Sequence, residues 1–463
     1  MPIFDQRRRQ ELDQLVEEYV TTSSINRRQF LQRATAAGLS ISGATALLAA
    51  CGGSPTGSGG TTKVQSIDVM TEWSGEELAS FNAINDAFKK KTGITVQVES
   101  SRDLPTILTT RVKGNNPPDI CGMPTLDMFH NLASQNKLVR LDKFFDMSTY
   151  QQNYAPAWVE LSSYNGGLYA VLPKANTKGT IWYSPKEFQA INATIPQTWN
   201  DLIALSDKIA ATGKYPWSMG VESSASSGWP AADWVDQIFL SLNGPDLYDQ
   251  WVAHKIPWTH SSVKNAFQMF GQIASGKHYI NGAPQAILAT NFQDASYLPF
   301  DAPAKAYMYY LGDFAAGFLT TQFKGIKAGT DYNFFPFPTL NPQYKGAVTG
   351  GADIVVAMKD NDGTRQFMEF MSTAEAQSIW VKRGGATAVN KGVNLADYPD
   401  DVARASAQQL TQATSFRVGA DDLMPSAMES AYWKGMLAYI AAPNQLDTIL
   451  SGLESTAQQV YQA

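Results

Sequence analysis

Tryptophan residues beside carboxylates are the combination in this chain that most directly suggests ligand chemistry. Trp73 lies three positions before Glu76, and Trp229 lies four positions before Asp233, with Glu222 a short distance upstream. An indole ring packs against flat apolar faces, and an ionised carboxylate makes strong hydrogen bonds with donors such as hydroxyl groups. The combination favours recognition of a polar, uncharged ligand.

Most of the other tryptophans are expected to be structural. Eight of the eleven lie between residues 158 and 258, and because tryptophan is usually well buried, roughly two thirds of these rings should be in the core. Trp217, Trp229 and Trp234 are the exceptions. Each stands among Gly, Ser, Pro or acidic residues typical of loops, so we predict that these rings are exposed or face a pocket.

The sequence carries no signature of catalysis or of metal binding. It has no Gly-x-Ser-x-Gly elbow, metal-binding histidine pair or phosphate loop. Residues 360–363 resemble part of a calcium loop, but Met358 stands where the first Asp is needed, so a turn is expected. No catalytic residue, cofactor or metal ligand is assigned. The carboxylates still leave a glycoside hydrolase open, which needs two of them about 5 or about 6.5–9.5 Å apart.

Alternating strands and helices must position these side chains. The hydrophobic pattern predicts strands over 64–70 and 94–98, helices over 76–91 and 104–113, and a third strand after Pro118. Such an order indicates a parallel sheet covered on both faces. Ligands of such sheets bind at the loops that follow the carboxyl ends of strands.

Those loops contain further candidates for the site. They span residues 72–76, 100–103 and 122–124, and the second contains the adjacent pair Arg102 and Asp103. These two side chains either face a ligand or pair only with each other. Further along, the pattern predicts a strand over 354–358 and one long helix over 364–383.

Composition sets the broad class of the protein. The chain has 463 residues, of which 44% are hydrophobic, 17% charged and 11% aromatic. About 400 residues beyond a leader exceed one comfortable core, so two lobes are expected. The net charge of −6 argues against a nucleic-acid or anionic-lipid partner. Few charges and many aromatic rings suit a neutral polar ligand such as a sugar.

The first 62 residues predict export and anchoring. Residues 26–31 (Asn-Arg-Arg-Gln-Phe-Leu) resemble a twin-arginine signal, and an uncharged run over 34–50 ends in Leu-Ala-Ala-Cys, which resembles a lipobox. We therefore expect a signal peptide over 1–50, lipidation of Cys51 and a flexible linker over 51–62. The mature protein would be extracytoplasmic and would reach the membrane only through its lipid.

The order of short motifs after residue 64 resembles the extracellular solute-binding proteins of carbohydrate ABC transporters, the broad family of maltose-binding protein. No single motif is specific, but their order and spacing together are, and the resemblance runs to the end of the chain. The matching stretches are residues 73–77, 88–94, 117–120, 165–170, 182–185, 198–202 and 350–352.

This resemblance implies an α/β, two-lobed fold of the periplasmic-binding-protein type II, with hinge-linked lobes and a ligand cleft between them. The expected crossing segments are 172–182, 306–311 and 350–358. Lobe I would then comprise 63–172 and 311–350, and lobe II 173–310 and 351–463. The implied partners are a sugar and the permease subunits of an ABC transporter, and a monomer is expected.

A narrower resemblance points to the α-glucoside-binding members of that family. It rests on residues 101–106, 228–230 with 233–234, 254–258, and 416–417 with 422–425. It implies an α-glucoside or a related oligosaccharide as the ligand. The alternatives are a lipid-anchored glycoside hydrolase and a binding protein for a non-sugar solute, such as a phosphorylated polyol or a peptide.

Loop position and resemblance together define one set of expected ligand-binding residues. For Arg417 and Asp422, a buried ion pair is an equal alternative to a place in the pocket. The full set is Trp73, Glu76, Arg102, Asp103, Trp182, Glu222, Trp229, Asp233, Gly351, Asp353, Arg417 and Asp422.

Overall fold

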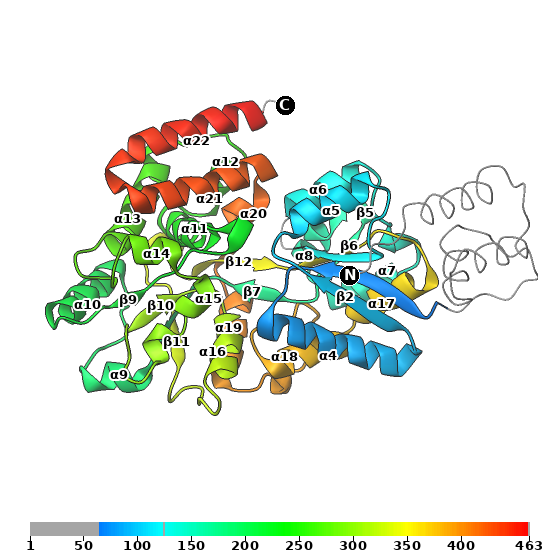
Figure 1. Ribbon diagram of the computed structural model, residues 1–463, viewed down its shortest axis with the longest axis horizontal. Coiled ribbons are helices and arrows are strands. Elements are labelled where there is room, and N and C mark those ends of the chain that lie inside the picture. Colours follow the sequence, from blue (N-terminus) through cyan, green and yellow to red (C-terminus); the bar gives the residue numbers. More distant parts are fainter. Residues whose placement is uncertain (1–63, 124–125, 462–463) are drawn as a thin grey trace, which may run out of the picture. The chain divides into compact units, whose positions relative to one another are not determined.

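The computed structural model describes residues 64–123 and 126–461, so the expected signal, Cys51 and the linker lie outside the described residues. Val64–Ala463 forms one compact unit. Its buried apolar side chains form two large clusters, one containing Phe81 and one containing Trp234. Each cluster is the core of one lobe, and Figure 1 shows the two lobes joined through a narrow middle region. The predicted two-lobed α/β fold is confirmed.

The first lobe is built on a five-stranded sheet in the order β2-β1-β3-β13-β6. β1 is parallel to β2 and to β3, whereas β13 is antiparallel to β3 and to β6. The expectation of parallel strands therefore holds for the first three. The strands are β1 (Ser66–Thr71), β2 (Thr95–Ser100), β3 (Ile120–Met123), β6 (Ala170–Val171) and β13 (Ile354–Ala357).

Helices cover this sheet. In the longest, α4, Glu76 and Glu77 lie in the first turn and three lysines in the last, as the helix dipole favours. Gly93 ends it with φ 81°, a left-handed conformation that glycine adopts without strain. The lobe's helices are α4 (Gly75–Thr92), α5 (Leu104–Lys113), α6 (Leu126–Ser134), α7 (Met147–Asn153), α8 (Pro156–Leu161), α17 (Asp362–Met371) and α18 (Ala374–Arg383), beside the hairpin of β4 (Ser163–Tyr164) and β5 (Gly167–Leu168).

The second lobe has a four-stranded sheet in the order β11-β8-β10-β9. Its strands are β8 (Thr180–Tyr183), β9 (Trp217–Ser218), β10 (Met308–Tyr310) and β11 (Asn333–Pro336). The helices around it are α9 (Pro185–Ala190), α10 (Trp199–Ala211), α11 (Trp229–Asn243), α12 (Pro245–Val252), α13 (Ser261–Ala274), α14 (Gln285–Ala289), α15 (Phe292–Ala295), α16 (Ala315–Gln322), α20 (Ala420–Leu423), α21 (Ser426–Ala441) and α22 (Leu446–Val460).

A third, three-stranded sheet lies at the junction of the lobes (Figure 1). Its order is β14-β12-β7, with β12 parallel to β14 and antiparallel to β7. β7 (Ala175–Thr177) leads from the first lobe to β8, and β12 (Ala347–Ala352) leads back to β13. After α19 (Asp401–Thr411), β14 (Ser415–Val418) leads to the last helices. These three passages join the lobes.

The structure differs from the expected division of the lobes in three places. The segment 311–350, expected in lobe I, contains β11, which pairs with β8 in the second sheet. The segment 306–311 contains β10, which pairs with β8 and β9 inside the second sheet, so it is not a crossing. The segment 351–463 is shared, because β13 extends the first sheet while α20 to α22 pack in the second lobe. The strands near 306, 350 and 415 are all short. Their hydrophobic patterns therefore do not distinguish a strand that crosses between lobes from a strand inside one lobe's sheet.

The predicted bounds of individual strands and helices were more accurate than the predicted lobe boundaries. β1, β2, α4 and α5 begin and end within two residues of their predicted ranges. The single helix predicted over 364–383 is two helices, because Thr373 accepts a hydrogen bond from the Ala376 N–H and caps a new start. Among the described residues, no helix is both long and apolar enough to span a membrane.

Candidate ligand-binding cleft

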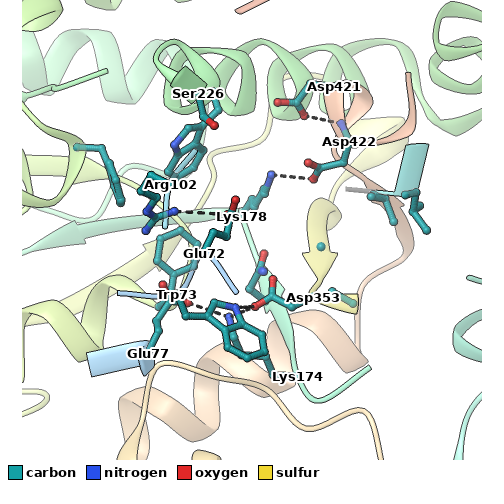
Figure 2. A pocket seen from close by; sticks show the side chains of 18 of the residues that line it. Glu72, Trp73, Glu77, Arg102, Lys174, Lys178, Ser226, Asp353, Asp421 and Asp422 are labelled. Atoms are coloured by element: carbon teal, nitrogen blue, oxygen red, sulfur yellow. Dashed lines mark hydrogen bonds and ion pairs between the residues drawn. The ribbon is translucent and has the colours of Figure 1, made fainter. Parts of the chain in front are cut away.

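A cavity lies between the two lobes, at the carboxyl end of β1 and the N-terminus of α11. It encloses about 950 Å³ of space, including the part open to solvent. Figure 2 shows charged side chains from both sides directed into it. Its walls consist of Glu72, Trp73, Glu77, Arg102, Leu126, Leu161, Lys174, Asn176, Lys178, Ser226, Trp229, Phe292, Phe314, Gly351, Ala352, Asp353, Val418, Asp421, Asp422 and Trp433.

On the first-lobe side, Lys174 and Trp73 converge on one carboxylate. The Trp73 Nε1–H donates to Asp353 Oδ2 at 2.6 Å, and Lys174 Nζ lies 2.7 Å from the same oxygen (Figure 2). Lys174 Nζ also lies 3.0 Å from Glu77 Oε1. Burial disfavours the charge of Lys174 most strongly, but the two carboxylates outweigh it and raise the pKa of the lysine. Lys174 is therefore a fixed cation.

On the second-lobe side, Lys178 has the same arrangement. Its Nζ lies 2.7 Å from Asp233 Oδ1 and 3.2 Å from Asp422 Oδ2. Here too burial opposes the charge, and the carboxylates raise the lysine pKa overall. Burial raises the pKa of Asp422 to about 7, although Lys178 lowers it. The raised pKa favours the protonated form of Asp422, whose carboxyl can donate as well as accept a hydrogen bond.

Arg102 links the loop after β2 to the opposite lobe. Its guanidinium lies 3.4 Å from Glu72 Oε1 and 5.5 Å from the centre of the Phe292 ring. The same group donates to Ser74 Oγ at 3.3 Å. Burial raises the pKa of Glu72 to about 7, and Arg102 opposes that rise. The contact of Arg102 with Phe292 brings the two lobes together at the rim of the cavity.

Aromatic rings form a separate part of the wall. Trp229 is half-buried and packs edge-on against Phe292 at 5.1 Å between ring centres, with Phe314 at 6.1 Å. Its position depends on Gly228, where φ is 110° and a Cβ would lie 2.5 Å from the Trp433 carbonyl oxygen. Glycine thus lets the chain approach α21 closely and enter α11 with Trp229 at the cavity.

A buried carboxylate cluster supports the floor behind Lys178. Oxygens of Asp233, Asp236 and Asp421 lie within 4.8 Å of one another. Asp236 accepts from the Ala420 N–H at 2.7 Å and from the Tyr432 hydroxyl at 3.0 Å. Because the cluster already receives these donors and the Lys178 ammonium, we assign it no metal.

Seven of the twelve expected site residues come together at or behind the cavity. Trp73, Arg102, Trp229, Gly351, Asp353 and Asp422 line it. Asp233 lies behind the wall and contacts the cavity only through Lys178. Arg417 and Asp422 do not form an ion pair with each other, because Asp422 pairs with Lys178.

The other expected residues lie elsewhere among the described residues. Glu76 pairs with Arg383 and accepts from Thr321, and Asp103 is exposed at the start of α5. Trp182 is buried within β8, where its Nε1–H donates to the Leu311 carbonyl at 3.0 Å. The Glu222 carboxylate accepts from Asn291 at 2.8 Å, and Arg417 pairs with Asp249 at 2.6 Å.

Two of the three predicted pocket-facing tryptophans are core residues instead. Trp217 and Trp234 are 1% and 2% exposed and pack against each other at 5.3 Å. The Trp217 Nε1–H donates to Ser206 Oγ at 2.9 Å. Loop-like neighbours did not distinguish them, because Trp217 begins the buried strand β9 and Trp234 lies inside the buried helix α11. Of these three rings, only Trp229 lines the cavity.

Several wall residues were missed by the sequence analysis. A signal was present for three of them: Lys174, Asn176 and Lys178 alternate along an extended stretch, and alternate residues of a strand share one face. That period of two places all three at the cavity. Glu72 belongs to the loop 72–76 that was expected at the site. No comparable signal marked Glu77, Phe292, Phe314, Asp421 and Trp433, because tertiary packing brings them to the cavity.

The arrangement is suited to binding. Indole and phenyl rings offer apolar faces, and carboxylates and lysines offer hydrogen-bond acceptors and donors at fixed positions. The site lies in the cleft of a two-lobed protein with three connecting passages, which is the design of a binding protein that closes around a solute.

Comparisons with known proteins agree with this class. Residues 72–378 match the family model of the bacterial extracellular solute-binding protein. The chain is 30% identical to the osmoprotective compounds-binding protein GgtB of Synechocystis, over 85% of this chain and 92% of GgtB. It is also 30% identical to the alpha-glucosides-binding periplasmic protein AglE of Rhizobium meliloti, over 83% of this chain and 85% of AglE.

Solved structures show the same fold at lower identity. The bacterial solute receptor AcbH superposes with a TM-score of 0.76 at 20% identity, over 86% of this chain and 99% of AcbH. Maltose-bound MalE3 of T. maritima gives 0.69 at 14% identity, over 86% of this chain and all of MalE3. The chain belongs to the bacterial extracellular solute-binding protein family. It is therefore an extracytoplasmic binding protein and not an enzyme.

Proposed function

We propose that this chain is the substrate-binding component of an ABC sugar importer, which captures a neutral sugar between its lobes and delivers it to permease subunits. The observation that carries the proposal is the combination of aromatic rings with paired charges in one interlobe cavity. Rings pack on the C–H faces of a sugar, and charged groups make the stronger hydrogen bonds to its hydroxyls.

The pairing of charges supports a neutral ligand over an anionic one. Each cation that lines the cavity has an acidic partner: Arg102 has Glu72, Lys174 has Asp353 and Glu77, and Lys178 has Asp233 and Asp422. A phosphate or carboxylate ligand would have to displace one of these carboxylates and remain beside it in a site of low dielectric. A hydroxyl group can bind to the paired groups without separating them.

Within the sugars, an α-glucoside or a related oligosaccharide is the ligand that we favour. One relative at 30% identity, AglE, is named for alpha-glucosides and supports this class. The cavity residues Arg102, Trp229 and Asp422 belong to the stretches that carry the α-glucoside resemblance. Capture would occur by closure of the lobes about the β7, β12 and β14 passages.

Delivery to a membrane transporter fits an anchored, monomeric protein. The lipobox-like sequence ending in Cys51 supports lipidation of that residue after export through a twin-arginine signal. The remainder of the chain would then contact the membrane only through its lipid and the permease subunits, without a nucleic-acid partner.

A thermal-shift screen of the purified protein tests the proposal. We expect an α-linked disaccharide of glucose, or a related glycoside, to raise the melting temperature, because ligand at about 100 times its dissociation constant adds about 2.7 kcal/mol of stability. Chromatography of the same samples should show intact sugar. A shift only with a phosphorylated polyol or a peptide would replace the sugar with that solute. Release of glucose by the protein would instead support the glycoside hydrolase.

A further inference from the structure

Asn176 occupies a corner of the cavity where two of the crossing strands meet. It lies in β7 between the two cavity lysines in the alternating pattern, so its side chain faces the ligand space. Its partner in the antiparallel pairing with β12 is Gly351, which also lines the cavity. Asp422, from α20, completes the corner.

The side-chain oxygen of Asn176 is buried without a hydrogen-bond donor. Asn176 is 7% exposed, and its Oδ1 has no hydrogen-bond partner among the described residues. Buried polar atoms in native proteins are almost always paired, and an exception indicates a partner that the protein alone does not supply. Because the residue lines the ligand cavity, a donor on a bound ligand would satisfy this oxygen.

Gly351 leaves the space that such a donor would fill. A Cβ at this position would lie 3.5 Å from Asn176 Oδ1, 3.6 Å from its Nδ2 and 3.8 Å from Asp422 Oδ2. The φ of Gly351 is not in the left-handed region, so its conformation does not require glycine. The neighbouring Gly350 differs, because a Cβ there would meet the Asn176 carbonyl at 2.4 Å. Gly350 is needed for the close packing of β12 against β7, whereas Gly351 leaves space for a ligand group beside Asn176 and Asp422.

We propose that Asn176, Gly351 and Asp422 form a specificity-determining corner that accepts one hydroxyl group of the bound sugar. This inference rests on the proposed sugar-binding function. The hydroxyl donates its single hydrogen to Asn176 Oδ1, and its oxygen accepts a hydrogen bond from the Asp422 carboxyl in its protonated form. A site built to hydrogen-bond a hydroxyl discriminates strongly against the analogue that lacks it.

The test combines variants with a series of monodeoxy analogues of the best-binding sugar, measured by calorimetric titration. We expect Asn176→Ala to weaken binding of the parent sugar at least tenfold. The wild-type protein should lose a similar factor with one particular deoxy analogue. For that analogue alone, Asn176→Ala should bind as well as wild type, since the two changes remove the same contact.

Two further variants separate contact from structure. Gly351→Ala fills the corner, so it should weaken the parent sugar several-fold and weaken the matching deoxy analogue less. Asn82→Ala, on an exposed position of α4, is the matched control and should bind every analogue like wild type. Gly351→Ala also tests the corner if Asn176→Ala fails to fold.

The outcomes distinguish this inference from the proposed function. Equal losses for Asn176→Ala with the parent and with every deoxy analogue would overturn the corner while leaving sugar binding intact. Full affinity of folded Asn176→Ala for the parent sugar would do the same. Failure of the wild-type protein to bind any neutral sugar would overturn both the proposed function and the corner.

Discussion

Trp73 Nε1 donates a hydrogen bond to Asp353 Oδ2 at 2.6 Å, which joins the loop after β1 to the passage between β12 and β13. The two residues are 280 positions apart in sequence. Lys174 holds the same carboxylate oxygen at 2.7 Å. This shared contact fixes the indole ring, the carboxylate and the ammonium at one end of the ligand cavity.

Replacement of Asp353 should therefore impair binding more than folding. Asp353→Asn keeps an acceptor for Trp73 but removes the charge that holds Lys174. We expect at least tenfold weaker sugar binding, about 1.4 kcal/mol, in a protein that still unfolds cooperatively. Asp249→Asn is the matched control, since Asp249 pairs with Arg417 away from the cavity. Equal affinities of Asp353→Asn and wild type would contradict this role.

A pair of tryptophan variants should separate the cavity from the core. Trp229→Ala should weaken sugar binding more than about tenfold, because the half-buried ring lines the cavity. Trp217→Ala, which removes a ring that is 1% exposed, should lower the free energy of unfolding by about 3–5 kcal/mol. Calorimetric unfolding and titration of both variants check the two effects. Unchanged affinity in folded Trp229→Ala would remove Trp229 from the site.

The sequence predicted the fold better than it predicted the site. Periodicity located β1, α4, β2 and α5, because each has its own hydrophobic pattern and end signals. The lobe boundaries failed at 306–311, since pairing partners of a three-residue strand depend on distant segments.

Loop position alone gave a mixed result for the site. Trp73 and Arg102 follow strand ends and line the cavity, but Glu76 turns away, because it lies inside the first turn of α4 and pairs with Arg383. Trp182 was expected at the site because it lies in a stretch that resembles the family, but its ring is buried within β8. Spacing along β7 would have revealed Lys178, which a search for loops passed over.

Stability should fall as pH rises through neutrality, in part because of Glu72. Burial raises the pKa of Glu72 to about 7, above its ordinary value of about 4.3. The folded state therefore binds more protons than the unfolded state between these values. The contribution is fully present below about pH 4 and is lost as pH rises through 7, by up to about 1.4 kcal/mol per pH unit.

Denaturant unfolding at pH 5.5, 6.5 and 8 measures this dependence. Glu72→Gln should show a shallower decline than wild type over that range, while the exposed substitution Glu375→Gln should keep the wild-type slope. A decline of equal steepness in Glu72→Gln and wild type would contradict the assignment.

Anchoring depends on Cys51 in the proposed pathway. Cys51→Ala should release the protein from membranes into the soluble fraction, because no acyl group can be attached, and its unlipidated mass should be visible by mass spectrometry. A variant that retains its membrane association would contradict lipidation at this residue, and so would an intact leader on membrane-released protein.

Calorimetric titration of the wild-type protein with α-linked glucose disaccharides tests the central claim most directly. We predict saturable binding of one sugar per chain with a dissociation constant in the micromolar range or tighter, about −8 kcal/mol or better. The sugar should be recovered unchanged. Absence of heat and of saturation with every neutral sugar, together with saturable binding of an anionic solute or a peptide, would contradict it.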